Sequence, residues 1–234
     1  MSDNIDNPVR SQRPIRSYVL HQGRITPRQA RALTVDWAAR GLATADFKQA
    51  ADWEQIFSRV APRVLEIGFG MGDSLIEMAR LSPEIDFLGV EVHRPGVGRC
   101  LARAQDIGLT NLKVFAEDVN GVLAAMPTGF LDKALLLFPD PWPKTKHHKR
   151  RIVQADFVTS LAEKIKKNGL FHLATDWQPY AEHMLAVLDG HPAWQNAYGR
   201  GHCVPDYTQR LQTKFEMRGK RLGHAISDLI YRRK

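Results

Sequence analysis

The sequence predicts a single α/β domain whose core is a mostly parallel β-sheet with helices on both faces. Five short apolar runs follow one another between residues 63 and 175, and helical patterns separate them. This alternation is typical of repeated βαβ units, because a helix must return the chain before the next parallel strand can begin. The length of 234 residues and the 44% hydrophobic content fit one generous domain better than two ordinary ones.

The predicted elements ahead of the sheet are an arm and a helix. Residues 1–25 are polar, rich in arginine and without periodicity, so we expect a flexible basic arm there and the domain itself over residues 26–234. Thr26 followed by Pro27 is typical of an N-cap and a first helical position. The apolar spacing after them predicts an amphipathic helix that continues through Trp37–Ala39.

The five predicted strands are the runs RVLEIGF, DFLGVEV, LKVFAED, KALLLFP and GLFHLAT. A helix is expected over about Ile152–Lys167 and ends at Asn168-Gly169, because both residues tolerate the left-handed conformation of a C-cap. Four further elements are expected after the fifth strand: a helix over 180–188, a short strand near Trp194, a basic helix over 214–222 and a last strand over 225–231.

The net charge of +8 is unevenly distributed along the chain. Residues 7–35 hold six arginines and no acid, residues 144–151 hold five basic side chains and no acid, and residues 210–234 hold eight basic and two acidic side chains. The rest of the chain is therefore acidic, and this separation predicts a polyanionic partner, with nucleic acid the leading candidate. For any one of the three segments, a solvated helix face remains the alternative.

Several classes of site and location are disfavoured. No apolar run approaches the roughly 18 residues of a bilayer-spanning helix, and the start MSDNIDNPVR lacks the apolar core of a signal peptide. We therefore expect a cytoplasmic protein without membrane contact. His147 and His148 are adjacent and point apart, and no third ligand is evident, so no metal site is predicted.

A glycine-rich segment, residues 68–72, follows the first predicted strand and reads GFGMG. Gly68 and Gly70 allow the backbone to approach a ligand closely. The spacing departs from the dinucleotide fingerprint G-x-G-x-x-G, because Asp73 stands where the third glycine is needed. Glu66, just before the segment, would repel a pyrophosphate, so a cationic ligand is favoured.

Acidic residues stand at the ends of the first four predicted strands: Glu66, Glu91, Glu117-Asp118 and Asp140. Because the carboxyl ends of parallel strands meet at one edge of the sheet, we expect these carboxylates to surround one ligand. Glu91 is placed to accept the ribose hydroxyls of an adenosine, and Asp118 to accept an adenine amino hydrogen. A ligand with a ribose, an adenine and positive charge is S-adenosylmethionine. For any one acid alone, a solvent-facing loop residue remains the alternative.

The fourth strand leads into the segment FPDPWPK, residues 138–144. Its three prolines fix the backbone around Asp140, so that the carboxylate is held rigidly. Phe138 and Trp142 either stack on a base or pack in the core. Since the basic segment 144–151 follows at once, the methyl acceptor is expected to be nucleic acid.

The fifth strand ends in Thr175-Asp176-Trp177 at the same edge of the sheet. A carboxylate here suits the two adjacent donors on the Watson–Crick edge of guanine. Asp176 therefore either binds a base or caps the helix that begins near Pro179.

Five segments of the chain together resemble one family: LEIGFGMGDSL, FLGVEVHRPGVG, FPDPWPK followed by HHKRRIVQ, LATDWQPYAEHML and TKFEMRGKRLGH. Over about residues 15–234 they resemble the tRNA (guanine-N7-)-methyltransferases of the single-chain bacterial type. The resemblance implies a Rossmann-like class I methyltransferase fold, with a seven-stranded sheet whose last strand is antiparallel. It also implies transfer of a methyl group from S-adenosylmethionine to N7 of guanosine 46 in the variable loop of tRNA.

The resemblance also implies roles for individual residues, with Asp140 as the catalytic one. The cofactor-binding residues, which include two glycines of the loop, are Glu66, Gly68, Gly70, Glu91, Asp118 and Asp140. The substrate-binding residues are Lys144, Asp176, Thr213, Lys214, Phe215 and Glu216. The residues expected to contact RNA are Lys146, His147, His148, Lys149, Arg150 and Arg151. The stretch 201–212 departs from the family pattern and is short.

The expected partner is tRNA, with no obligatory protein partner and a monomeric chain. An exocyclic-amine methyltransferase of DNA or RNA is the nearest alternative, although PDPWPK lacks its paired D/N-P-P-Y/F/W form. An NAD-dependent oxidoreductase is disfavoured by the glycine spacing and by Glu66. A non-catalytic RNA-binding module would need the basic segments but no acids at the strand ends.

Overall fold

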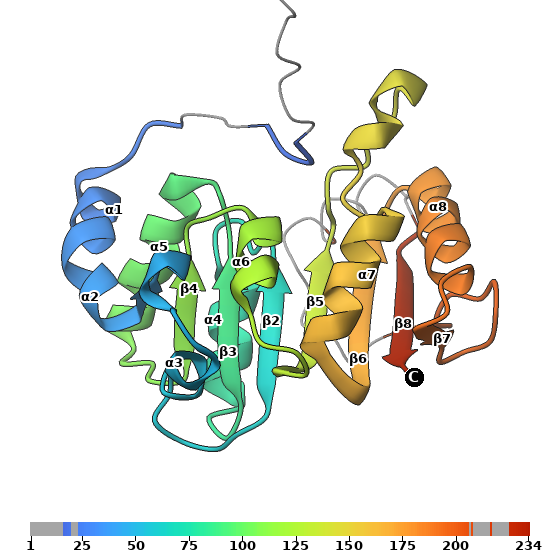
Figure 1. The fold of residues 1–234 in the computed structure, drawn as a ribbon. Helices are drawn as coiled ribbons and strands as arrows, with labels where there is room; N and C mark the ends of the chain where they lie inside the picture. Colours follow the sequence, from blue (N-terminus) through green and yellow to red (C-terminus); the bar gives the residue numbers. More distant parts are fainter. Residues whose placement is uncertain (1–15, 20–22, 206, 208–215, 217–224) are drawn as a thin grey trace, which may run out of the picture.

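The computed structural model describes residues 16–19, 23–205, 207, 216 and 225–234 (Figure 1). Its strands are β1 (Gly41–Leu42), β2 (Arg63–Ile67), β3 (Asp86–Val90), β4 (Leu112–Phe115), β5 (Leu131–Leu137), β6 (Ile165–Thr175), β7 (Trp194–Asn196) and β8 (Ser227–Arg233). Its α-helices are α1 (Pro27–Arg31), α2 (Trp37–Arg40), α3 (Ala50–Glu54), α4 (Asp73–Leu81), α5 (Arg94–Asp106), α6 (Val119–Ala125), α7 (Ala155–Lys164) and α8 (Gln178–Asp189). The short helices are the π-helical η1 (Ala32–Asp36) and the 3-10 helices η2 (Thr44–Asp46) and η3 (Thr145–Arg150).

The sheet is mostly parallel, as the sequence predicts. Its order is β1-β4-β3-β2-β5-β6-β8-β7, and among the described strands β8 runs opposite to all the others, so that its pairings with β6 and β7 are antiparallel. The five predicted strands and the antiparallel last strand are present, so the predicted fold class is confirmed. The described sheet has eight strands and not seven, because β1 pairs with Val114 and Phe115 at its edge. A two-residue strand leaves no periodic signal in a sequence.

The first predicted helix is confirmed with its capping residues. The Thr26 side chain accepts a hydrogen bond from the backbone of Gln29, whose own side chain accepts one from the Thr26 backbone. Pro27 stands at the first helical position, where its missing N–H has no partner to lose. The segment continues through η1 and ends with α2 at Arg40, so it is one helical run with a widened turn in its middle.

The helix expected over 152–167 is shorter than the sequence predicts. It begins at Ala155 and ends at Lys164, because Ile165 pairs with Leu131 and so starts β6. Asn168 is left-handed, with φ of 65°, but it makes a turn inside β6 and not the end of the helix. Residues 166–168 are polar and lie between the helix and the apolar part of β6, so in the sequence they read as a continuation of the helix. The end of the helix is set by the pairing of Ile165 with β5.

The elements expected after Tyr180 are confirmed where the structure describes them. They are α8, β7 and β8, all within a few residues of the expected ranges. The basic helix expected over 214–222 lies outside the described residues except for Glu216. In the described part of the chain, no helix is both long enough and apolar enough to cross a bilayer.

Helices cover both faces of the sheet, as Figure 1 shows. On one face α3, α6, α7 and α8 bury a core that includes Trp53, Phe157 and Tyr180. On the other face α4 and α5 bury a second core that includes Leu75 and Val97. Burial of such side chains is worth about 1.5–3 kcal/mol each, so the two cores hold the sheet rigidly between them.

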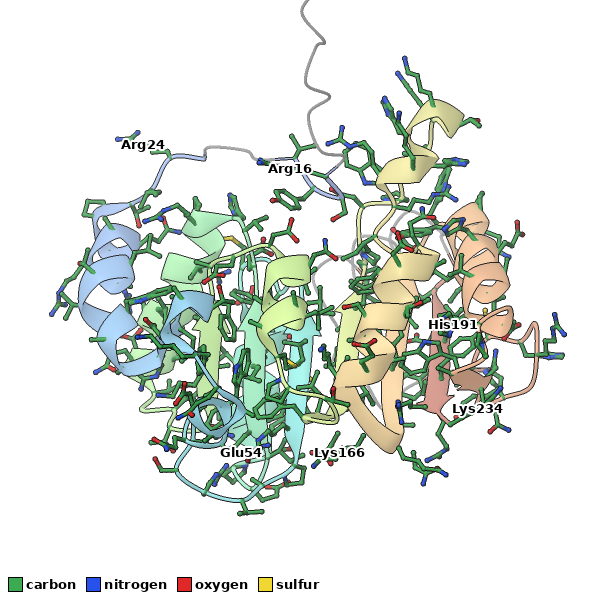
Figure 2. All side chains as sticks on the ribbon, in the orientation of Figure 1. Arg16, Arg24, Glu54, Lys166, His191 and Lys234 are labelled. Atoms are coloured by element: carbon green, nitrogen blue, oxygen red, sulfur yellow. The ribbon has the colours of Figure 1, made fainter. Side chains whose placement is uncertain are left out.

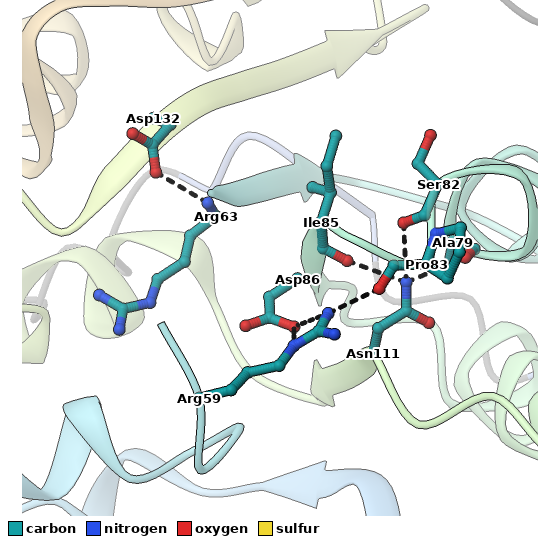
Figure 3. Close-up of polar contacts among 9 residues, drawn as sticks. All are labelled: Arg59, Arg63, Ala79, Ser82, Pro83, Ile85, Asp86, Asn111 and Asp132. Atoms are coloured by element: carbon teal, nitrogen blue, oxygen red, sulfur yellow. Dashed lines mark hydrogen bonds and ion pairs between the residues drawn. The ribbon is translucent and has the colours of Figure 1, made fainter. Parts of the chain in front are cut away.

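The amino ends of the strands are closed by polar contacts (Figure 3). The fully buried Asp86 accepts two hydrogen bonds from the Arg59 guanidinium, at 2.8 and 2.6 Å. The Asp132 carboxylate accepts a bond from the Arg63 backbone, and Asn111 donates from its side chain to three backbone carbonyls. This end of the sheet is therefore structural, and the opposite end is left for a ligand.

The strand order reverses at β2. The chain proceeds from β2 to β3 and β4 on one side, and then returns to place β5 and β6 on the other side. Connections that leave in opposite directions open a crevice at the carboxyl ends of β2 and β5, which is where open α/β sheets bind ligands.

Candidate active site

A cavity of about 710 Å³ occupies this crevice. It is lined by residues at the carboxyl ends of β2, β3 and β5, including Glu66, Glu91 and Asp140. Three of the acids expected at strand ends are therefore brought together, along with Glu117 after β4. The volume is that of a site for a drug-sized or nucleoside-sized ligand.

The glycine loop after β2 is left-handed at each of its glycines. The φ angles of Gly68, Gly70 and Gly72 are 72°, 58° and 77°, which side chains with a Cβ rarely adopt. A Cβ on Gly72 would meet the Cys100 side chain at 2.7 Å, whereas none at Gly68 or Gly70 would meet an atom within 4 Å. The first two glycines therefore serve the backbone conformation along the cavity, and the third also serves packing on α5.

Glu66 is the buried acid of the cavity, with 3% of its surface exposed. Its Oε2 atom is buried and has no hydrogen-bond partner within the described structure. Burial, together with the nearby charge of Glu91, raises the pKa of Glu66 to about 8. A carboxyl group held in this way gains from a cationic ligand, because a positive charge restores the ionised form.

Glu91 connects the end of β3 to the glycine loop. Its carboxylate accepts hydrogen bonds from the backbone N–H groups of Gly70, Val92 and His93, at 2.8, 2.7 and 2.8 Å. A carboxylate offers about four acceptor positions, so about one remains for a ligand. If Glu91 accepts hydrogen bonds from both ribose hydroxyls, as predicted, the two hydroxyls must share its one remaining acceptor position.

Asp118 lies beside the cavity and caps α6. Its side chain accepts hydrogen bonds from the backbone and the side chain of Asn120, at 2.8 and 3.0 Å. The residues on either side of it, Glu117 and Val119, line the cavity. The Glu117 carboxylate is held by the backbone and the hydroxyl of Thr44.

The segment 138–144, which we call the reacting loop, has an unusual backbone. Phe138 and Trp142 have φ of 53° and 45°, in a region that bulky side chains rarely adopt. Asp140 stands between them, exposed and lining the cavity. A strained backbone on both sides of a carboxylate indicates that its position is functionally constrained.

The basic residues after the reacting loop divide into two groups. Lys144, Lys146 and Lys149 are exposed on or next to η3, as a phosphate-binding surface requires. Arg151 is only 4% exposed, and its Nε donates to the Pro141 carbonyl at 3.0 Å. The burial of Arg151 makes it a support for the reacting loop, unlike the RNA contact expected from the run of basic residues.

The two histidines of η3 are half-buried. His147 lies edge-on to the Trp142 ring, with 5.8 Å between the ring centres. Desolvation and the surrounding cations lower the pKa of His147. His148 contacts the Arg151 guanidinium at 3.1 Å. In the described residues no group of three or more candidate metal ligands occurs.

The other expected substrate residues are only partly described. Asp176 is half-buried at the end of β6, and α8 begins with Trp177 at the N-cap position and without a side-chain capping bond. The N-cap position of α8 is thus occupied by Trp177, and Asp176 stands one residue before it. Glu216 is described and is 4% exposed. Thr213, Lys214 and Phe215 lie outside the described residues.

Three residues of the site have no counterpart in the sequence predictions. Ser74 at the start of α4 lines the cavity, and its buried hydroxyl has no partner among the described residues. Ser17 and Tyr18, which come from the expected arm, also line the cavity. Nothing in a polar, arginine-rich segment distinguishes these two side chains from their neighbours.

The fold and the site define a class of protein. An acid-lined crevice beside a glycine loop, in a parallel sheet whose last strand is antiparallel, is that of a class I S-adenosylmethionine-dependent methyltransferase. The aminoglycoside resistance methyltransferase NpmB1 shares this fold with a TM-score of 0.56 at 13% identity, over 80% of this chain and 94% of that one. A 16S rRNA (adenine(1408)-N(1))-methyltransferase variant from Catenulisporales acidiphilia, solved with the cosubstrate SAM, has a TM-score of 0.51 at 18% identity, over 79% and 89% of the two chains.

Sequence comparison narrows the class to one family. A family model described as "Putative methyltransferase" matches residues 60–229. The tRNA (guanine-N(7)-)-methyltransferase of Photobacterium profundum is 50% identical over 223 residues, which are 94% of this chain and 90% of the relative. That of Shewanella amazonensis is 51% identical over 94% and 92% of the two chains. The chain belongs to the tRNA (guanine-N(7)-)-methyltransferase family, and the resemblance seen in its sequence is confirmed.

Proposed function

We propose that this protein transfers the methyl group of S-adenosylmethionine to N7 of guanosine 46 in the variable loop of tRNA. The observation that carries the proposal is the cavity at the carboxyl edge of the sheet, lined by carboxylates and adjoined by the basic helix η3. An anion-lined cavity suits a cationic donor, and an adjoining cationic surface suits a polyanionic acceptor. A non-catalytic RNA-binding module would need only the second of these.

The residues of the cavity fit S-adenosylmethionine. Its ammonium and sulfonium groups are positive, and the orphaned Oε2 of Glu66 is a buried acceptor in a group whose charge needs a cation. The Ser74 hydroxyl is a second buried polar group without a partner in the described structure. The remaining capacity of Glu91 suits a ribose hydroxyl. When bound, the cofactor supplies an electrophilic methyl group.

Methyl transfer to N7 requires the protein to align the reacting atoms and to stabilise positive charge, but it does not require a general base. Guanine N7 carries a lone pair and no proton, so its attack requires no proton acceptor. Positive charge develops on the purine during transfer, and the Asp140 carboxylate at the cavity stabilises it. Holding the reacting atoms in line is worth up to about 7–11 kcal/mol in favourable systems. The reacting loop, with its three prolines, supplies the rigid support that such alignment needs.

The exposed lysines of η3 and its flanks bind the phosphates of the tRNA. Lys144, Lys146 and Lys149 are all exposed, at the end of the reacting loop and on η3. Asp176 holds the edge of the target guanine. We further propose that the protein acts in the cytoplasm as a monomer and needs no protein partner, since it carries its own RNA-binding surface.

The direct test is transfer of labelled methyl from S-adenosylmethionine to unmodified tRNA transcripts that differ only in guanosine or adenosine at position 46. We expect label only with guanosine, and chain cleavage at that nucleotide after borohydride and aniline treatment. Label on both transcripts that resists this cleavage would support the exocyclic-amine alternative. Absence of transfer despite cofactor binding would contradict the proposed substrate. Gel filtration with light scattering tests the monomeric state.

A further inference from the structure

The segment Arg16–Val19, which we call the strap, contributes two residues to the lining of the cavity. Its Ser17 and Tyr18 line the cavity, although more than 40 residues separate them from β2, the first strand of the cavity. Figure 2 shows Arg16 at the end of the sheet toward which β2 to β6 point, far from Glu54 and Lys166 at the other end. The strap is thus a wall of the site that comes from outside the sheet.

The side chain of Tyr18 in the strap is held by Asp118, which follows β4 beside the cavity. The Tyr18 hydroxyl interacts with the Asp118 carboxylate, and burial together with this negative neighbour raises the pKa of Tyr18. The protonated hydroxyl is the donor of this hydrogen bond, and the carboxylate accepts it. Asp118 follows β4, so this contact links Tyr18, which lines the cavity, to the β4 end of the site.

The backbone of the strap is held by two residues from the reacting loop and η3, Trp142 and Arg150. Arg150 donates from Nε to the Arg16 carbonyl at 3.0 Å and from a terminal nitrogen to the Tyr18 carbonyl at 3.1 Å. Trp142 donates from its indole N–H to the Ser17 carbonyl at 3.2 Å. The guanidinium also lies 3.9 Å from the centre of the Trp142 ring, so the two donors support each other.

These contacts join two functions that the sequence places far apart. Arg150 does not line the cavity, and it belongs to the basic helix η3, part of which is proposed above to bind the tRNA. Its side chain nevertheless fixes the backbone that carries Tyr18 into the cavity. Arg150 thus belongs to the basic helix and also holds the strap. A residue shared in this way can make the affinity for S-adenosylmethionine depend on bound tRNA, and the affinity for tRNA depend on bound S-adenosylmethionine.

We propose that Tyr18 is a cofactor-binding residue, and that the clamp of Arg150 and Trp142 on the strap couples cofactor binding to tRNA binding. The inference rests on the proposed function, because it takes S-adenosylmethionine as the ligand of the cavity. Tyr18 contacts the cofactor with its ring, whereas Arg150 acts on the cofactor only through the strap and is a positioning residue.

The test measures the affinity of the full-length protein for S-adenosylmethionine by calorimetry in the absence of RNA. Tyr18→Ala is expected to weaken binding by about tenfold, the effect of losing one aromatic contact face. Tyr18→Phe, which keeps the ring and loses the anchor to Asp118, is expected to weaken it by about threefold. Arg150→Ala is expected to weaken it by about threefold to tenfold, and the double variant Tyr18→Ala/Arg150→Ala no more than Tyr18→Ala alone.

Lys167→Ala is the control, since it removes an exposed cation near the start of β6, at the opposite end of the sheet, that has no described contact with the strap. Its cofactor affinity should stay within about twofold of the wild type. A role of Arg150 in RNA binding alone would leave cofactor affinity unchanged in the RNA-free protein, and that result would overturn the coupling. Tighter binding by Tyr18→Ala would show that Tyr18 blocks the cavity, and unchanged binding would show that it does not touch the cofactor.

The same measurements separate this inference from the proposed function. A wild-type protein that binds no S-adenosylmethionine would refute the function itself, whatever the variants do. A wild type that binds, with Tyr18 variants that bind equally well, would refute only the role of the strap. As a second readout, S-adenosylhomocysteine should tighten tRNA binding in the wild type, and this effect should disappear in Tyr18→Ala.

Discussion

The ionisation of Glu66 offers a quantitative test of the site. Burial and the charge of Glu91 raise the pKa of this carboxyl from its ordinary value of 4.5 to about 8. The folded state therefore holds a proton that the unfolded chain has lost at neutral pH. The favourable contribution of the protonated group is complete below pH 4.5, decreases as the pH rises, and is gone above pH 8.

Glu66→Gln removes this ionisation and keeps the shape of the side chain. Each unit of pKa shift corresponds to about 1.36 kcal/mol. At pH 7 the free energy of unfolding of the variant should therefore be about 3 kcal/mol higher than that of the wild type. At pH 5 the difference should fall below about 1 kcal/mol. For a domain of this size the gain at pH 7 corresponds to about 6–12 °C in Tm.

The assay is chemical unfolding followed by circular dichroism, at pH 5, 6 and 7 and without cofactor. Other titrating groups are common to both proteins, so the difference between them isolates Glu66. An effect of Glu66→Gln that is the same at pH 5 and pH 7 would refute the raised pKa. Glu66→Gln should also bind S-adenosylmethionine more weakly than the wild type, because an amide cannot balance the positive charge of this ligand.

Three further substitutions probe the other parts of the site and the fold. Asp140→Ala should lower kcat by about 100-fold to 1000-fold with little change in tRNA affinity, measured by single-turnover transfer and filter binding; an equal loss in both would contradict its electrostatic role. Arg151→Gln should lower kcat while the salt dependence of tRNA binding stays as in the wild type, because the buried guanidinium supports Pro141; a reduced salt slope would instead indicate a phosphate contact. Arg40→Ala should destabilise the fold by about 1–3 kcal/mol in urea unfolding, since the buried guanidinium bonds the Leu109 carbonyl; unchanged stability would contradict this.

The sequence predicts the sheet and the position of the acids well, because both depend on local patterns. Apolar runs between helical segments define the strands, and parallel strands bring Glu66, Glu91 and Asp140 to one edge without any detailed knowledge of packing. The same reasoning misses β1, whose pairing is too short to leave a pattern. It also misplaces the end of α7, because the pairing of Ile165 with Leu131 depends on a distant part of the chain.

The sequence cannot predict which polar groups are already occupied. Glu91 is correctly placed at the cavity, yet three backbone N–H groups take most of its capacity. Arg151 follows a run of basic residues and looks like its neighbours, but the chain turns inward after η3 and buries it. Tyr18 reaches the cavity through contacts with Trp142 and Arg150, which are more than 120 residues away.

The reacting loop is held from two sides, and neither contact involves the carboxylate of Asp140, the proposed catalytic residue. Arg151 holds the Pro141 carbonyl from the core, and Ser17 in the strap accepts the Trp142 indole N–H. These contacts stabilise the left-handed backbone of Trp142, a conformation that costs about 1–3 kcal/mol in an ordinary loop. A displacement of about 1 Å can reduce a rate by 100-fold when alignment provides the catalysis. If Asp140 has the proposed role, the support of the loop matters to the reaction as much as the carboxylate, and the contact of the strap with Trp142 is part of that support.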